Sequence, residues 1–151
     1  MQTRSRPSSF GVREQSMKHD HFSLDADGTP TAPGVFVDLQ SVPSIEFVEG
    51  VKFQPTLGQN MLANYVSYEP HSEAPLHVHS EEQVVIVVGG EFDFTIDGET
   101  RRMGIGDIAV IPPWVPHGAK AGEKGCTQID VFSPPRATLV ELARRDASGN
   151  A

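Results

Sequence analysis

Short apolar runs recur along most of this sequence, and each is closed within a few residues by glycine, proline or aspartate. Runs of this length are typical of β-strands, because an amphipathic helix would space its apolar residues three or four apart over a longer stretch. Many short, evenly spaced strands predict an all-β sandwich or barrel, and the absence of an internal repeat indicates one barrel. The predicted strands cover residues 34–39, 45–53, 61–69, 75–80, 83–90, 91–100, 101–113, 116–121 and 126–133.

One predicted hairpin is especially clear. Phe92, Phe94 and Ile96 alternate with polar residues, which predicts a strand with one buried face. The Asp97–Gly98 pair that follows is typical of a tight turn between two antiparallel strands. Helical spacing of apolar residues occurs only in residues 136–146, where we expect a short C-terminal helix.

The charge of the chain excludes some classes of partner. Its 151 residues carry a formal net charge of −8, whereas nucleic acids and anionic membranes bind clustered lysine and arginine. No apolar run is long enough to span a membrane, and none near Met1 resembles a secretory signal. The single cysteine, Cys126, excludes an internal disulfide. We therefore expect a cytoplasmic protein that binds neither nucleic acid nor membrane.

The N-terminal part differs from the rest. Residues 1–18 hold four basic residues against one acidic residue and show no periodicity, which is typical of a disordered arm. Met17 is an alternative start to Met1, and the sequence leaves this open. We expect a basic arm over residues 1–30, a β-barrel over 31–136, and a C-terminal helix and tail over 137–151.

Two histidines stand immediately before an apolar run. Side chains two apart in a strand point to the same face, so His77 and His79 are predicted to face the same way. Gln83 follows at the start of the next predicted strand, and His117 ends a proline-rich corner after a later strand. Three imidazoles and one oxygen donor would make a complete ligand set for a divalent metal. A structural or surface role remains the alternative for each histidine.

These two segments resemble the paired motifs of the cupin superfamily, over roughly residues 60–133. The first motif is matched in spacing by His77, His79, Gln83 and Gly90. The second motif is matched by Gly106, Pro112, Trp114 and His117, with Trp114 at a position that is usually glycine. The resemblance implies a jelly-roll, an antiparallel double-stranded β-helix barrel, with a metal ion inside. It implies the metal ligands His77, His79, Gln83 and His117.

The sequence departs from the cupin pattern at two further positions. Gln83 stands where most cupins have glutamate, and a neutral ligand would leave the ion a stronger Lewis acid. This favours carbonyl or hydrolytic chemistry over oxygen activation, for which a carboxylate ligand is common. His71 stands where the first motif usually has glycine, so it is a candidate ligand or base. A solvent-exposed histidine is the alternative.

The segment DVFSPPR, residues 130–136, resembles one found in two kinds of small cupin. One kind is the pectin-degradation type, which acts on unsaturated uronates, and the other is the aromatic polyketide cyclase. In the first kind the Asp, Phe and Arg belong to the pocket, which implies such roles for Asp130, Phe132 and Arg136. Asp130 and Phe132 share a strand face, and Asp130 could act as general acid or base. Surface ion pairing and core packing are the alternatives.

Aromatic residues supply further candidates for substrate binding. Trp114 replaces a glycine beside His117, and we expect it at the mouth of the barrel. Tyr65 and Phe92 would line an apolar pocket if they face the interior, with core packing as the alternative.

We therefore predict a metal-dependent polyketide cyclase. The metal would polarise a carbonyl or enolate oxygen, while Asp130 or His71 moves the proton, and ring closure and aromatisation would follow. Zinc is the expected ion because this chemistry needs no redox change, with nickel, iron or manganese as alternatives. The expected partners are a polyketide, which an acyl carrier protein could present, and a second copy of the chain. The cupin resemblance implies this homodimer, with residues 33–42 as the candidate exchanged strand.

Three alternative functions remain open at this point. The first is a uronate-type cupin that opens unsaturated galacturonate, which would need polar pocket walls and Arg136 as a carboxylate ligand. The others are a cupin dioxygenase and a small-molecule-binding cupin without catalysis.

Overall fold

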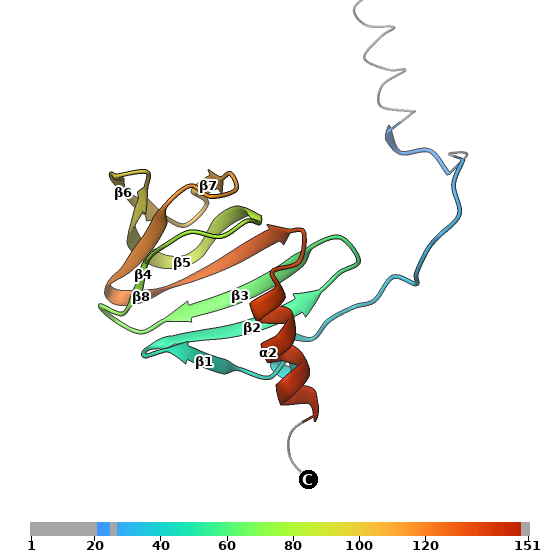
Figure 1. Ribbon diagram of the computed structural model, residues 1–151, viewed down its shortest axis with the longest axis horizontal. Coiled ribbons are helices and arrows are strands. Elements are labelled where there is room, and N and C mark those ends of the chain that lie inside the picture. The colour runs from blue at the N-terminus through green and yellow to red at the C-terminus, as the bar shows by residue number, and fades with distance from the viewer. Residues whose placement is uncertain (1–20, 25–26, 149–151) are drawn as a thin grey trace, which may run out of the picture. The chain divides into compact units, whose positions relative to one another are not determined.

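A computed structural model describes residues 21–24 and 27–148 of the protein, except for the side chains of residues 145–148 (Figure 1). The chain divides into two compact units, Met1–Val35 and Phe36–Ala151. The described residues of the first unit contain no strand. Most of the predicted basic arm, residues 1–20, lies outside the described residues.

The second unit is an antiparallel β-structure with one C-terminal helix. All of its strand pairings are antiparallel, in the order β1-β2-β3-β8-β5-β6, with β4 paired to β8 and β7 paired to β5. The elements are η1 (Leu39–Ser41), β1 (Ile45–Val48), β2 (Val51–Leu57), β3 (Leu62–Tyr68), β4 (Glu73–His77), β5 (Glu82–Ile96), β6 (Glu99–Gly104), β7 (Ile108–Ile111), β8 (His117–Ser133) and α2 (Ala137–Ser148).

Two long strands, β5 and β8, hold the two layers of the barrel together. The first half of β5 pairs with β7 and with the second half of β8, which itself pairs with β3. The second half of β5 pairs with β6 and with the first half of β8, which pairs with β4. Because each long strand crosses from one layer to the other, the sheet rolls up into a jelly-roll (Figure 1).

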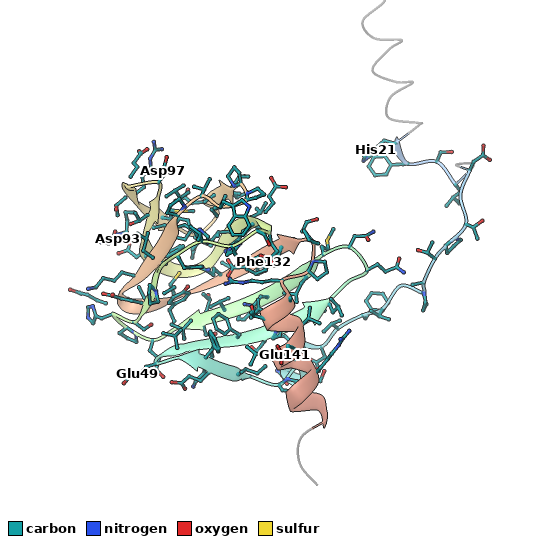
Figure 2. All side chains as sticks on the ribbon, in the orientation of Figure 1. His21, Glu49, Asp93, Asp97, Phe132 and Glu141 are labelled. Atoms are coloured by element: carbon teal, nitrogen blue, oxygen red, sulfur yellow. The ribbon has the colours of Figure 1, made fainter. Side chains whose placement is uncertain are left out.

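The apolar core lies between the two layers. Val51, Val66, Val85 and Phe92 are fully buried there. One end of the barrel is covered by α2, where Leu139 packs with Leu62 and Phe132. Figure 2 shows Phe132 in the interior, whereas Asp93 and Asp97 lie at the periphery beside β6.

Much of the predicted fold is confirmed. The Phe92/Phe94 face is buried, and Asp97 and Gly98 form the turn between β5 and β6 with positive φ angles of 47° and 82°. The C-terminal helix is present as α2, one residue later than expected. Several predicted strands prove to be parts of longer or divided elements, since residues 83–96 form one strand and residues 45–57 form a hairpin.

One predicted strand is wrong. Residues 34–38 have no regular structure, and the short helix η1 follows them. Their apolar side chains lie in solvent, with Phe36 fully exposed and Val37 48% exposed. A strand needs a neighbouring edge for its backbone hydrogen bonds, and this segment has no paired strand in the described part of the chain.

No helix among the described residues is long and apolar enough to cross a membrane.

Candidate metal centre

The two histidines of the first motif reach the interior by different routes. His77 is the last residue of β4 and pairs with His117 on β8. His79 lies beyond the end of β4, in the connection to β5, yet it is only 8% exposed. The prediction that one strand carries both histidines is therefore wrong, although both rings reach the same place, with centroids 5.6 Å apart.

The corner between β7 and β8 holds His79 and His117 in position. The backbone N–H of Trp114 donates to the carbonyl oxygen of His79 over 2.8 Å. Trp114 has a φ of 67°, in the left-handed region that favours glycine, which explains why glycine is usual at this position of the motif. Trp114 is 66% exposed, while His117 at the start of β8 is buried.

Four side-chain atoms converge on one point in the interior. The Nε2 atoms of His79 and His117 lie 3.1 Å apart, and the Oε1 atom of Gln83 lies 3.0 Å from each of them. His77 completes the group, because one ring nitrogen from each of the three histidines falls within 4.8 Å of the others. We refer to His77, His79 and His117 as the histidine cluster. Gln83 lies in contact with it.

The hydrogen bonds of the Nδ1 atoms indicate which ring nitrogen of each histidine carries a proton. The Nδ1 atoms of His77, His79 and His117 lie 2.7, 2.9 and 2.8 Å from the backbone carbonyl oxygens of Pro75, Glu81 and Val115. A carbonyl oxygen only accepts, so each Nδ1 carries a proton, and a neutral ring with this proton presents a lone pair at Nε2.

These lone pairs make the site fit a metal cation. The Nε2 atoms of His79 and His117 and the Oε1 atom of Gln83 lie about 3 Å apart, and lone pairs at such distances repel one another unless a proton or a metal cation lies among them. Burial lowers the pKa of His77, and it lowers the pKa of His117 to about 4, so both rings are neutral at pH 7. Neutral imidazole is the form that binds metal, and carbonyl partners at Nδ1 are the usual way to orient it.

Asp130 lies beside this cluster inside the barrel. It is 5% exposed and faces inward from β8, as its alternation with Phe132 predicted. Its carboxylate accepts a hydrogen bond from Gln128 Nε2 at 2.8 Å and another from the side chain of Gln83. Burial raises the pKa of Asp130 to about 7, despite these two hydrogen bonds. A carboxyl group that titrates near neutral pH can both accept and donate a proton.

Arg136 and Phe132 adjoin the same site. Phe132 is buried and meets the ring of His79 edge-on, with centroids 5.6 Å apart. The guanidinium carbon of Arg136 lies 5.6 Å from the centroid of the Phe132 ring. Besides burial, the positive charge of Arg136 lowers the pKa of both His77 and His117, so this half-buried cation lies near the histidine cluster.

Three other candidate residues lie elsewhere. His71 is exposed on the turn between β3 and β4 with a φ of 64°, and it lines a surface pocket with Lys120 and Lys124 rather than joining the histidine cluster. Tyr65 points to the outer face of the sheet, because strand alternation sends its neighbours Asn64 and Val66 inward. Phe92 is completely buried in the core, where it stacks against Tyr68.

Sequence reasoning missed four residues around the site. Three of them face the interior, namely Asn64, Gln128 and Tyr68. The fourth is Glu81, whose carboxylate lies 3.5 Å from His79 Nδ1. Burial raises the pKa of Tyr68, and the nearby charge of Asp130 adds to this. The signal that could have found the first three is their alternation with apolar residues on β3 and β8.

Comparison with known proteins places this site in context. The family model for the cupin domain matches residues 64–132. The chain is 30% identical over 107 residues to the pectin degradation protein KdgF of Dickeya dadantii, covering 70% of this chain and 96% of that protein. It is 34% identical over 76 residues to the H2HPP isomerase of Bacillus subtilis, but it spans only 32% of that protein's length.

Two solved structures also match the fold of this chain. KdgF from a Halomonas species matches with a TM-score of 0.67 and 28% identity, covering 71% of this chain and 99% of that one. The polyketide cyclase RemF from Streptomyces resistomycificus matches with a TM-score of 0.62, covering 70% of this chain and 82% of that one. Its identity is 20%, so this match supports the fold alone.

Proposed function

The chain belongs to the cupin family, and from this premise we propose that it is a metal-dependent isomerase that converts an unsaturated uronate from its enol to its keto form. The observation that carries the proposal is the buried Asp130 beside the histidine cluster, with Arg136 facing the same site. The similarity to KdgF over 96% of that protein's length supports it.

Four residues would hold the metal: His77, His79, His117 and Gln83. A divalent ion bound there would polarise a substrate oxygen and stabilise negative charge on it. Zinc is the ion we propose, because the reaction involves no redox change.

Asp130 would move the proton. Its buried carboxyl group accepts a hydrogen bond from the side chain of Gln83, the same side chain that contacts the histidine cluster. In the closed ring the double bond carries the ring oxygen, so the hydroxyl proton of the hemiacetal leaves first and the ring C–O bond breaks to give an aldehyde and an enolate. A proton is then added to carbon, which gives the ketone, and atoms balance without a co-substrate. A single carboxyl group can do both when its pKa lies near the working pH.

Arg136 would bind the carboxylate of the uronate. It is half-buried at the site, where a charge-assisted hydrogen bond to a carboxylate is strong. The interior beyond the cluster also holds buried polar side chains, Asn64, Gln128 and Asp130, which suit an oxygen-rich substrate. These are the polar walls and the cationic partner that the uronate alternative requires.

The polyketide cyclase remains a second candidate. One observation favours it: the rings of Phe132 and Phe94 lie 5.6 Å from His79 and 6.3 Å from His117, so part of the site is aromatic. The same metal ligands and the same Asp130 would serve a cyclisation through an enolate.

Incubating the metal-loaded protein with unsaturated galacturonate and, separately, with a short β-polyketone tests the proposal. We expect the ultraviolet absorbance of the uronate double bond to disappear with the wild type. Asp130→Asn should slow this by about 10²- to 10⁴-fold at unchanged metal content, whereas His71→Ala should leave the rate unchanged. Cyclisation of the polyketone without uronate turnover would instead support the cyclase, and no turnover of either would favour a binding protein.

A further inference from the structure

The barrel interior contains three buried polar atoms that have no hydrogen-bond partner in the described part of the chain. They are Nδ2 and Oδ1 of Asn64 and Oε1 of Gln128. Asn64 is 1% exposed and Gln128 is 2% exposed, so bulk water does not reach them. Because desolvated polar atoms are costly, nearly all of them in folded proteins are paired with protein, ordered water or ligand. The proposed proton transfer assigns no role to these atoms.

Their positions group them around Asp130. Asn64 on β3 stands directly opposite Asp130 on β8, and Gln128 lies two residues before Asp130 on the same inward face. The Nε2 atom of Gln128 donates to Asp130 Oδ1 at 2.8 Å, which leaves its Oε1 atom without a partner. On its other side Asp130 is hydrogen-bonded by Gln83, which adjoins the histidine cluster. A ligand that reaches Asp130 from the histidine cluster would therefore meet Asn64 and Gln128 next.

The unpaired atoms match one chemical group. Asn64 offers an N–H donor and a carbonyl acceptor, and Gln128 offers a second acceptor. A hydroxyl group can accept from Asn64 Nδ2 and donate to one of the two carbonyl oxygens. A ketone has no donor and would leave both acceptors unpaired, and a carboxylate would add a second negative charge beside Asp130.

We propose that Asn64 and Gln128 form a hydroxyl-binding subsite of the barrel, which selects a hydroxylated substrate over a simple diketone. This rests on the proposed function, because the hydroxyl group belongs to the substrate that Asp130 acts on. Asn64 is a specificity residue in this arrangement, and Gln128 both contacts the hydroxyl group and positions Asp130.

Asn64→Leu tests the subsite, because leucine has nearly the same size and no polar atom. Calorimetric titration of the zinc-loaded full chain with D-galacturonate and with D-galactose should show binding that weakens about tenfold in this variant. Removing unpaired polar atoms should leave the melting temperature unchanged or raise it. Tyr65→Phe is the matched control, since it removes a hydroxyl group from the outer face of the same strand and should change nothing. Asn64→Ala serves as a second variant if the leucine variant does not fold.

Each of the other possible results of this titration either supports or overturns the hydroxyl-binding subsite. Equal affinity in the wild type and the Asn64 variants, or no binding of either sugar by the wild type, would overturn the subsite and leave these atoms to ordered water. Sugar binding that depends on Asn64, without turnover of unsaturated galacturonate, would support the subsite and contradict the proposed function. Loss of stability with unchanged affinity would make Asn64 a structural residue and overturn the proposal.

Discussion

At the scale of single residues, Gln83 connects the two halves of the site. Its Oε1 atom lies 3.0 Å from Nε2 of both His79 and His117, and its side chain also hydrogen-bonds Asp130. An amide can present an acceptor to a cation and a donor to a carboxylate at the same time, whereas an ionised glutamate has acceptors only. The structure therefore adds a second reason for glutamine beside its effect on Lewis acidity.

We expect Gln83→Glu to retain the metal and to lose about 10- to 100-fold in activity. The new carboxylate would face that of Asp130, and like charges at close range raise the pKa of Asp130 further. The pH–rate profile should show this as an ionisation displaced to higher pH. The double variant Gln83→Glu, Asp130→Asn removes the repulsion and should regain the stability that the single variant loses at alkaline pH. An unchanged pH profile would contradict the proposed contact.

The histidine cluster makes a separate prediction. Elemental analysis of the purified wild type should give about one divalent ion per chain, and His117→Ala should give far less, since losing one ligand weakens binding severely. His71→Ala is the control, because His71 is exposed and lies outside the cluster. Full metal retention in the His117 variant would contradict the assigned ligands.

At the scale of the elements, the barrel depends on the bends that carry β5 and β8 from one layer to the other. In β5 the register shifts on both sides of Gly89 and Gly90. Gly90 has a φ of 64°, and a Cβ atom there would meet the carbonyl oxygen of Gly125 on β8. Only glycine fits where the two backbones approach so closely, which is why the first motif ends at this residue.

Gly90→Ala should lower the free energy of unfolding by about 3 kcal/mol or more, combining the strain of a left-handed residue with a backbone clash. Gly98→Ala is a matched control, because its φ is 82° but no atom lies within 4 Å of the added Cβ. This control should cost only about 1–2 kcal/mol. Urea unfolding of the three proteins measures the difference, and equal losses would show that the clash is absent.

At the scale of the whole molecule, the outward face formed by β3, β8, β5 and β7 is apolar. Apart from Glu82 at the start of β5, the outward positions on β3, on β7 and on the adjoining halves of β5 and β8 carry no charge, and Ile108 and Val110 are 62% and 55% exposed. The strand register aligns these residues in rows across the sheet: Ala63, Val131, Val84 and Val110, and Tyr65, Ile129, Ile86 and Ile108. Large exposed apolar patches mark interaction sites, and an uncharged face can pair with its own copy.

We expect this face to form the homodimer that the cupin resemblance implies. Val110→Lys would bury an unpaired charge, which costs several kcal/mol, and should shift the protein toward the 16.4 kDa monomer. Light scattering after size-exclusion chromatography measures this. Leu76→Lys is the control, because Leu76 is 66% exposed on β4, outside this face. A monomeric wild type would contradict the dimer, and a dimer unaffected by Val110→Lys would favour exchange of residues 33–42.

The sequence by itself determined the features that depend on local spacing. Strand alternation placed Phe92, Phe94, Asp130 and Phe132 on inward faces, since residues two apart in a strand always share a side. The Asp97–Gly98 turn followed from the φ angles that those residues tolerate. The resemblance to the cupin motifs implied that the three histidines and Gln83 form one group, and their side chains do lie together, even though His79 lies beyond the strand that was expected to carry it.

Only the tertiary structure decided the features that depend on partners distant in the chain. Asn64 became part of the site because β3 pairs with β8 in a register that sets it opposite Asp130. Tyr65, one residue later, falls on the outer face for the same reason, although the sequence suggested a pocket residue. Residues 34–38 have strand-like composition but pair with no strand in the described part of the chain. A strand's inward face and its neighbours are set by its pairing register, and that register is a property of the whole sheet.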